Sequence, residues 1–143
     1  MQIRPFERCD EAAVVGLWQE CGLTRPWNDP HKDIARKLEV QPELFLVGVL
    51  DGEVVATVMA GYEGHRGWVN YLAVAKRFRG RGYGRALMRY VENLLRLRGC
   101  PKLNLQVRNS NPQAIEFYRH LGYEQDEAVS LGKRLTSDRL PET

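Results

Sequence analysis

The segment from Lys76 to Ala86 holds the residues whose types and spacing best suit a chemical role. Gly80, Gly82 and Gly84 alternate there with other residues. Glycine allows positive φ angles and lets a ligand approach the backbone closely. The segment opens a helical pattern, so several N–H groups lack a partner within the helix and the helix dipole is positive there. This combination favours the binding of a phosphate group.

The charges around these glycines also favour an anionic ligand. Basic residues surround them with no acidic residue in between: Lys76, Arg77, Arg79, Arg81, Arg85 and Arg89. Because the start of a helix repels cations, each misplaced arginine costs about 0.3–1 kcal/mol, and a bound polyanion would reverse the sign of that cost. A glycine-rich turn with a solvated basic face is the alternative that involves no ligand.

The common nucleotide-binding patterns do not fit this segment. A P-loop requires Gly-Lys-Ser or Gly-Lys-Thr, and neither occurs in the chain. The dinucleotide pattern requires Gly or Ala at its third position, where Arg85 or Leu87 stands. Nucleotide hydrolysis and hydride transfer therefore lose most of their support.

Apolar periodicity outlines the elements that must position this segment. Helices are expected at 10–21, 30–40, 82–98 and 111–122, with Asp10 and Asp29 capping the first two. Strands are expected at 2–5, 44–50, 53–62, 68–74 and 103–107, and one or two closing strands between 123 and 134. The order βααβββαβαββ predicts an α/β (α+β) fold with a mixed, mostly antiparallel sheet and helices on both faces.

Length and composition predict a single globular domain over residues 1–143. The chain is 43% hydrophobic and 27% charged, with a net charge of +3. It has no apolar run near the roughly 18 residues of a membrane span, and its start lacks a signal-peptide pattern. Three cysteines without a CxxC pair argue against a disulfide framework and a zinc site. We expect a cytoplasmic protein that binds no metal.

Two motifs resemble those of the GNAT superfamily of acetyl-CoA-dependent N-acetyltransferases. Arg79, Gly82 and Gly84 match its Arg-x-x-Gly-x-Gly signature between a strand and a helix. Residues 111–123 match its Asn-x-x-Ala-x-x-Phe-Tyr-x-x-x-Gly-Tyr pattern. The resemblance covers essentially the whole chain, and the segments 25–30 and 61–67 are similar to those of small bacterial acetyltransferases.

The resemblance implies that acetyl-CoA is the co-substrate. The loop would hold its diphosphate through Arg79, Gly80, Arg81, Gly82, Tyr83, Gly84 and Arg85. The preceding strand would contact the pantetheine arm and the thioester oxygen through Leu72, Ala73 and Val74. Backbone N–H groups suit this role because negative charge develops on that oxygen during attack. Asn111 would contact the cofactor as well, or serve only as an ordinary helix cap.

The resemblance also implies that Tyr118 is the general acid that protonates the leaving thiolate. Full transfer from a tyrosine of pKa near 10 to a thiolate near 8.5 is uphill by roughly 2 kcal/mol, so a hydrogen bond in the transition state would suffice. The general base stays open between Glu63, His65 and a water held by Asn70 or Tyr71. A lysine-type amine needs such a base far more than an α-amine does.

The acceptor is expected to meet the loop between the first two helices. Arg25, Trp27 and Asn28 are the candidate substrate residues of this loop, together with Asn70. Arg25 would suit an acceptor that carries a carboxylate. Trp27 is either a wall of the acceptor site or a hydrophobic anchor.

The sequence thus predicts direct transfer of an acetyl group from acetyl-CoA to a primary amine of a small molecule, peptide or protein. A catalytically inactive CoA-binding regulatory domain is one alternative. A small basic nucleic-acid-binding protein is another, although that function would leave the glycines unexplained. We expect no nucleic-acid or membrane partner, and exposed sheet edges would permit a homodimer.

Overall fold

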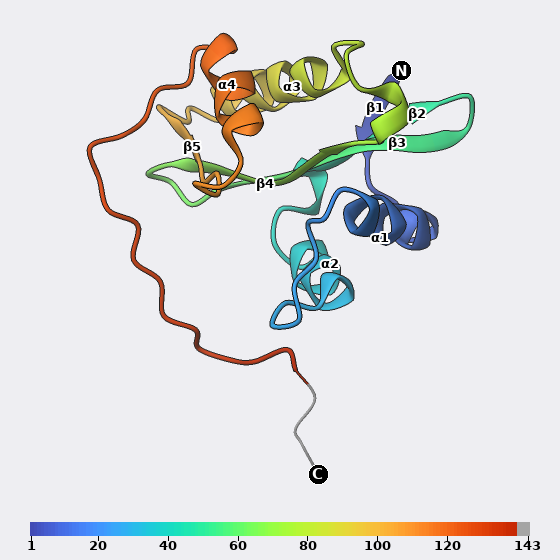
Figure 1. Ribbon diagram of the computed structural model, residues 1–143, viewed down its shortest axis with the longest axis horizontal. Coiled ribbons are helices and arrows are strands. Elements are labelled where there is room, and N and C mark those ends of the chain that lie inside the picture. The colour runs from blue at the N-terminus through green and yellow to red at the C-terminus, as the bar shows by residue number, and fades with distance from the viewer. Residues whose placement is uncertain (140–143) are drawn as a thin grey trace.

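A five-stranded sheet forms the centre of the computed structural model, which describes residues 1–139 (Figure 1). Its strands lie side by side in chain order: β1 (Gln2–Pro5), β2 (Phe45–Leu50), β3 (Glu53–Tyr62), β4 (Gly67–Val74) and β5 (Leu103–Leu105). Neighbouring strands from β1 to β4 are antiparallel, whereas β5 is parallel to β4. The prediction of a mixed, mostly antiparallel sheet is confirmed.

Helices cover both faces of the sheet, as expected (Figure 1). One face carries α1 (Glu11–Glu20) and α2 (Pro30–Leu38), and the other carries α3 (Tyr83–Leu97) and α4 (Pro112–His120). Successive strand residues point to opposite faces. Phe45 and Val47 therefore pack toward α1 and α2, and Leu46 packs toward α3. None of the helices within residues 1–139 is both long and apolar enough to cross a membrane.

Side-chain caps set the starts of α2 and α4. The carboxylate of Asp29 accepts a hydrogen bond from the N–H of His31 at 2.8 Å. The side-chain carbonyl of Asn111 accepts one from the N–H of Ala114 at 3.1 Å. A proline follows each cap at the first helical position, where its missing N–H costs nothing. Both helix starts agree with the sequence signals.

Asp10 has a different role from the helix cap that we expected. Its side chain makes no capping bond to α1. Instead its carboxylate accepts hydrogen bonds from Arg4 Nη1 at 2.7 Å and from the N–H of Glu7 at 2.8 Å. The guanidinium of Arg4 was a stronger partner than a backbone amide, because both groups are charged. Asp10 thus ties β1 to the turn that precedes α1.

A bulge interrupts β4 and ends its pairing with β5. The register between β3 and β4 shifts between Thr57 and Met59, and Tyr71 has a positive φ of 54°. Such a φ is rare for a bulky residue and must be held by its surroundings. The ladder between β4 and β5 stops at the pair of Val69 and Leu105. The strand expected over 103–107 is therefore shorter, at 103–105.

Trp18 of α1 holds this bulge in place. Its side chain is fully buried, and its indole stacks on the ring of Tyr71 with centroids 3.8 Å apart. The indole Nε1 donates to the hydroxyl of Thr57 at 2.9 Å, and that hydroxyl donates to the carbonyl of Tyr71 at 2.9 Å. A continuous hydrogen-bonded chain thus links α1, β3 and β4.

The C-terminal strap, defined here as residues 124–139, leaves α4 and runs across to α2 (Figure 1). We predicted one or two closing strands between 123 and 134, and this prediction is wrong for the described residues. The strap meets β5 through side chains, since Lys102 and Asn104 bond to the carboxylate of Asp126 at 2.7 and 2.8 Å.

The alternation of apolar residues in the strap explains the wrong prediction. Val129, Leu131 and Leu135 have the spacing of a strand face, but they are 85%, 90% and 91% exposed. A strand face is stable only when it is buried against another layer. β5 offers a ladder of only three residues as a template. The strap therefore stays extended without a backbone ladder.

Replacing Trp18 by alanine should lower the free energy of unfolding by about 3–5 kcal/mol, because a fully buried ring and its hydrogen bond are lost. Leu97→Ala, at a position of α3 that is 85% exposed, should change it by less than about 0.5 kcal/mol. Urea unfolding followed by circular dichroism measures both variants. Similar losses in the two variants would contradict the role given to Trp18.

Candidate active site

The glycine-rich segment forms the turn between β4 and α3. Gly80 and Gly82 have φ angles of 83° and 81°, and a Cβ at either position would meet no atom within 4 Å. Backbone conformation, rather than crowding, therefore requires glycine here. Gly82 stands at the N-cap of α3, which receives no side-chain cap from the described residues. The N–H groups from Tyr83 onward thus form an open helix start, which we call the cradle (residues 79–85).

Gly84 has a separate role in packing. It is buried, and a Cβ there would lie 3.2 Å from the ring of Phe117 and 3.6 Å from the side chain of Val74. Its missing side chain lets α4 lie against α3 and the end of β4. This contact couples the cradle to the helix that carries Tyr118.

Arginine side chains make the surroundings of the cradle positive. Arg79 lies back along the chain, where its Nε donates to the carbonyl of Val74 at 3.3 Å. It thereby anchors the turn to the end of β4. Arg81 and Arg85 are exposed. Their guanidinium groups and the uncapped helix start together create a surface that attracts anions.

A cavity of about 730 Å³ lies where β4 and β5 cease to pair. Its walls come from the loop between α1 and α2, from α2, β4, β5 and α4. The residues that the sequence suggested from distant segments and that meet on this wall are Arg25, Asn28, Asn70, Leu72, Asn111 and Tyr118. Ala73 pairs with Thr57 instead and is buried in the core beside α1.

Tyr118 of α4 lines this cavity and has mostly apolar surroundings. Its ring makes edge contacts with Phe117 and Tyr123, with centroids 5.0 and 5.7 Å apart. Burial raises the pKa of Tyr118 to about 12, because the apolar surroundings disfavour the phenolate. The hydroxyl is therefore a proton donor, and not a base, at any physiological pH.

Asn111 combines the two roles that its sequence position suggested. Its side-chain carbonyl caps α4, and the residue also lines the cavity. The NH₂ group of the same side chain is left over from the capping bond. A cap and a ligand contact are thus compatible at this residue.

The comparisons with known proteins assign the family. A profile of the Acetyltransferase (GNAT) family matches residues 12–123. An acetyltransferase of Pectobacterium atrosepticum is 51% identical over 139 residues, which cover 97% of this chain and 99% of that protein. The chain belongs to the GNAT acetyltransferase family. An uncharacterized N-acetyltransferase of Yersinia pestis is 50% identical, with the same coverage of both chains.

Solved structures agree with this assignment of a GNAT acetyltransferase. Ard1 from Thermoplasma volcanium has a TM-score of 0.74 and 31% identity, over 85% of this chain and 80% of that one. The ribosomal-protein-S18-alanine N-acetyltransferase from Escherichia coli has a TM-score of 0.72 and 25% identity, over 87% and 78% of the two chains. This chain therefore has the fold of these structures and is an acetyltransferase.

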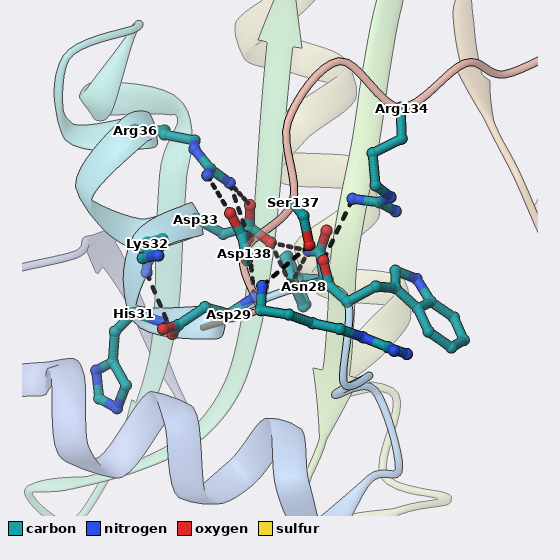
Figure 2. A network of polar contacts seen from close by, with 12 residues as sticks. Asn28, Asp29, His31, Lys32, Asp33, Arg36, Arg134, Ser137 and Asp138 are labelled. Carbon is teal, nitrogen blue, oxygen red and sulfur yellow. Dashed lines mark hydrogen bonds and ion pairs between the residues drawn. The ribbon is translucent and has the colours of Figure 1, made fainter. Parts of the chain in front are cut away.

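One wall of the cavity is a polar network that joins Asn28 and Tyr71, both suggested by the sequence, to Asp33 and Arg36, which sequence reasoning missed (Figure 2). Asp33 of α2 is its centre. Its carboxylate accepts hydrogen bonds from the hydroxyl of Tyr71 at 2.6 Å, from Arg36 Nη1 at 3.1 Å and from the amide of Asn28. Burial and the bond to Asp33 both raise the pKa of Tyr71, so its hydroxyl stays protonated.

A signal for this network was present in the sequence of α2. Asp33, Arg36 and Lys37 are three and four residues apart, which places them on one face of a helix. All three line the cavity. The mixture of charges resembled an ordinary solvated face, and only the packing of α2 beside β4 distinguishes the two cases.

The structure does not bring the base candidates Glu63 and His65 to the cavity. Both are exposed in the turn between β3 and β4. The carboxylate of Glu63 accepts hydrogen bonds from the N–H groups of His65, at 3.1 Å, and Arg66. Neither residue belongs to the cavity wall. In this acetyltransferase the side chain of Glu63 stabilises the turn, to which His65 contributes its backbone N–H.

The candidate substrate residues of the loop between α1 and α2 differ in whether they line the cavity. Arg25 lines the cavity, but one of its guanidinium nitrogens bonds to the loop carbonyls of Gly22 and Thr24 at 2.7 and 2.8 Å. Trp27 is 37% exposed and does not belong to the cavity wall. Its carbonyl accepts a hydrogen bond from Arg134 of the strap at 3.3 Å. Trp27 therefore contacts the strap rather than the cavity.

The cradle conformation predicts opposite effects for two glycine-to-alanine substitutions. Gly82→Ala should lower the free energy of unfolding by about 1–2 kcal/mol, because alanine is strained at positive φ. Gly16→Ala should raise it by about 0.5–1 kcal/mol, since Gly16 lies inside α1 with no atom within 4 Å of an added Cβ. Urea unfolding measures both, and stabilisation by Gly82→Ala would contradict the observed turn.

Proposed function

We propose that this chain transfers the acetyl group of acetyl-CoA directly to a primary amine. One observation carries the proposal: Tyr118 and the stretch of β4 beyond its pairing with β5 line the same cavity, and β4 leads from it toward the cradle. A donor that lies along β4 would have its phosphates at the cradle and its reacting end beside Tyr118. The N-acetyltransferase names of the relatives support the same reaction.

The cradle fits the diphosphate of acetyl-CoA. An added Cβ would meet no atom at Gly80 or Gly82, so there is open space over the N–H groups that begin α3. These groups and the helix dipole favour a bound phosphate. Arg81 and Arg85 would supply the counter-charge at the rim. The arginines that are unfavourable at an empty helix start would then become favourable.

The bulge of β4 would support the thioester end of the donor. Beyond Val69, the edge of β4 has no strand partner on the side of β5, so its N–H groups at Leu72 and Val74 are the candidates for donor contacts. A preorganised N–H donor stabilises the negative charge that develops on the thioester oxygen as an amine attacks. The open edge thus has a chemical use that a paired strand would lack.

The transfer itself then needs no covalent intermediate on the protein. The amine nitrogen attacks the thioester carbon, the bond from carbon to sulfur breaks, and the sulfur leaves as a thiolate. Tyr118 donates its proton to that sulfur, either fully or as a hydrogen bond in the transition state. The amine loses a proton to water, and after full transfer Tyr118 regains a proton from water. None of the wall residues of the cavity is a histidine that could activate Cys21, the thiol on the wall.

Tyr118→Phe should lower kcat about 10²- to 10⁴-fold, which is the usual size of a general acid contribution. The Kd for acetyl-CoA should change little, because the ring and its packing remain. Tyr90→Phe is the matched control, since Tyr90 is a partly exposed residue of α3 outside the cavity. Release of CoA thiol, measured with a panel of amines, reports the rate.

The pH dependence of kcat is a second test of the proposed role of Tyr118 as a general acid. A raised pKa means that the protonated hydroxyl persists above its ordinary range. Because the pKa of Tyr118 is raised to about 12, kcat should show no alkaline decline below about pH 10. A kcat within about threefold of wild type for Tyr118→Phe, or an alkaline decline near pH 9 that the variant removes, would contradict the proposed role.

A further inference from the structure

The carboxylate of Asp138 forms an ion pair with the guanidinium of Arg36, a residue of the cavity wall (Figure 2). Asp138 Oδ2 accepts hydrogen bonds from the N–H of Asp29 at 2.9 Å and from Arg36 Nη1 at 3.2 Å, while its Oδ1 pairs with Arg36 Nη2. This is a bidentate ion pair between a guanidinium and a carboxylate. Arg36 and the N–H of Asp29 lower the pKa of Asp138 to about 2, so the carboxylate is ionised at neutral pH.

Arg36 belongs to the cavity as well as to this ion pair. Its side chain is 50% exposed and lines the cavity wall, whereas the side chain of Asp138 is only 3% exposed. Arg36 Nη1 also donates to Asp33, which faces the same cavity. A group that binds a carboxylate thus lies directly beside a carboxylate that can bind an ammonium group.

The strap that delivers Asp138 is held weakly. It has no backbone ladder to the sheet, and its apolar residues Val129, Leu131 and Leu135 are almost fully exposed. Near its end, the contacts to the rest of the chain are polar: the carboxylate of Asp138 and the bond from Arg134 to Trp27. Segments with few buried apolar contacts open at low free-energy cost. Release of the Asp138 carboxylate would therefore break polar contacts only.

We propose that Arg36 and the N–H of Asp29 form a carboxylate-binding subsite for the acceptor, and that Asp138 occupies it until an amino acid takes its place. The inference rests on the proposed function, because it names the acceptor class of the cavity, which the subsite adjoins through Arg36, while Asp29 and Asp138 lie next to the wall and not on it. The acceptor would be a free amino acid, whose amine and carboxylate lie close together. Asp138 acts as an internal competitor that leaves with the strap.

The charges around Asp33 match the amine of such an acceptor. A carboxylate has about four lone-pair sites, and Asp33 uses three of them for Tyr71, Asn28 and Arg36. One acceptor position is left for an ammonium or amine N–H. An α-amine is less basic than a lysine-type amine, so its deprotonation costs less free energy.

Matched pairs of amines that differ only in a carboxylate test the subsite. The pairs are lysine and cadaverine, ornithine and putrescine, histidine and histamine, and tyrosine and tyramine. In wild type, kcat/KM with acetyl-CoA should be at least about 10-fold higher for the amino acid of the preferred pair, as expected for a bond to a charged group. Arg36→Gln should abolish this preference.

The Asp138→Asn variant distinguishes an Asp138 that competes with the acceptor for Arg36 from an Asp138 that only anchors the strap. The neutral amide holds Arg36 less tightly, so the KM for the amino acid should fall about three- to tenfold, while the rate with the decarboxylated amine stays unchanged. Asp126→Asn is the matched control, because it removes a strap carboxylate that pairs with Lys102 instead. Equal kcat/KM within every pair, or a preference that survives in Arg36→Gln, would overturn the subsite.

Hydrogen exchange reads the subsite without any turnover. In wild-type protein, each amino acid in excess should accelerate exchange in the strap peptide 134–139, and its decarboxylated partner should not. No acceleration by any of the four amino acids overturns the subsite, even if the protein acetylates amines. If acetyl-CoA binds but no amine is acetylated, the proposed function fails, and the exchange result still decides whether the carboxylate subsite exists.

Discussion

The hydrogen-bonded chain from Trp18 through Thr57 to Tyr71 holds β4 in a bulged shape on which the site depends. A residue at positive φ costs about 1–3 kcal/mol, and Tyr71 has no glycine-like freedom to avoid that cost. Burial of the Trp18 indole against the Tyr71 ring, together with the two hydrogen bonds, offsets it. Because the bulge ends the pairing with β5, it creates both the cavity and the open edge of β4. The hydroxyl of the same tyrosine bonds to Asp33, so the bulge is also connected to the polar network on the cavity wall.

The helices of this acetyltransferase differ in whether a side chain caps their first backbone N–H groups. This difference matches the proposed role of each helix. Asp29 and Asn111 cap α2 and α4 with side chains, as helices in a stable scaffold usually are. The start of α3 has a glycine at positive φ, no side-chain cap and arginines close by. Such a start is unfavourable by itself and favourable beside an anion. Among α2, α3 and α4, only the start of α3 is one that local stability alone would not favour.

Sequence reasoning succeeded where a local rule determines the structure and failed where packing does. The caps at Asp29 and Asn111 and the glycine turn before α3 follow from local chemistry, and the structure agrees. Asp33 and Arg36 were missed, since a charged helix face has the same pattern whether it meets water or a cavity. The prediction of closing strands in the strap was wrong, because the spacing of Val129 and Leu131 does not reveal whether a partner strand lies beside them. Homodimer formation and the roles of individual cofactor-binding residues stay predictions.

The binding of acetyl-CoA at the cradle is the central claim, and calorimetric titration tests it most directly. Wild type should bind acetyl-CoA with a Kd of about 1–100 μM, and Gly82→Trp should weaken binding at least about 10-fold by filling the space over the helix start. Gly99→Trp places the same side chain at a similar positive φ just beyond the C-terminal end of α3, at the opposite end of that helix from the cradle, and should bind as wild type does. No binding by folded wild-type protein, or equal affinity in the two tryptophan variants, would contradict the account.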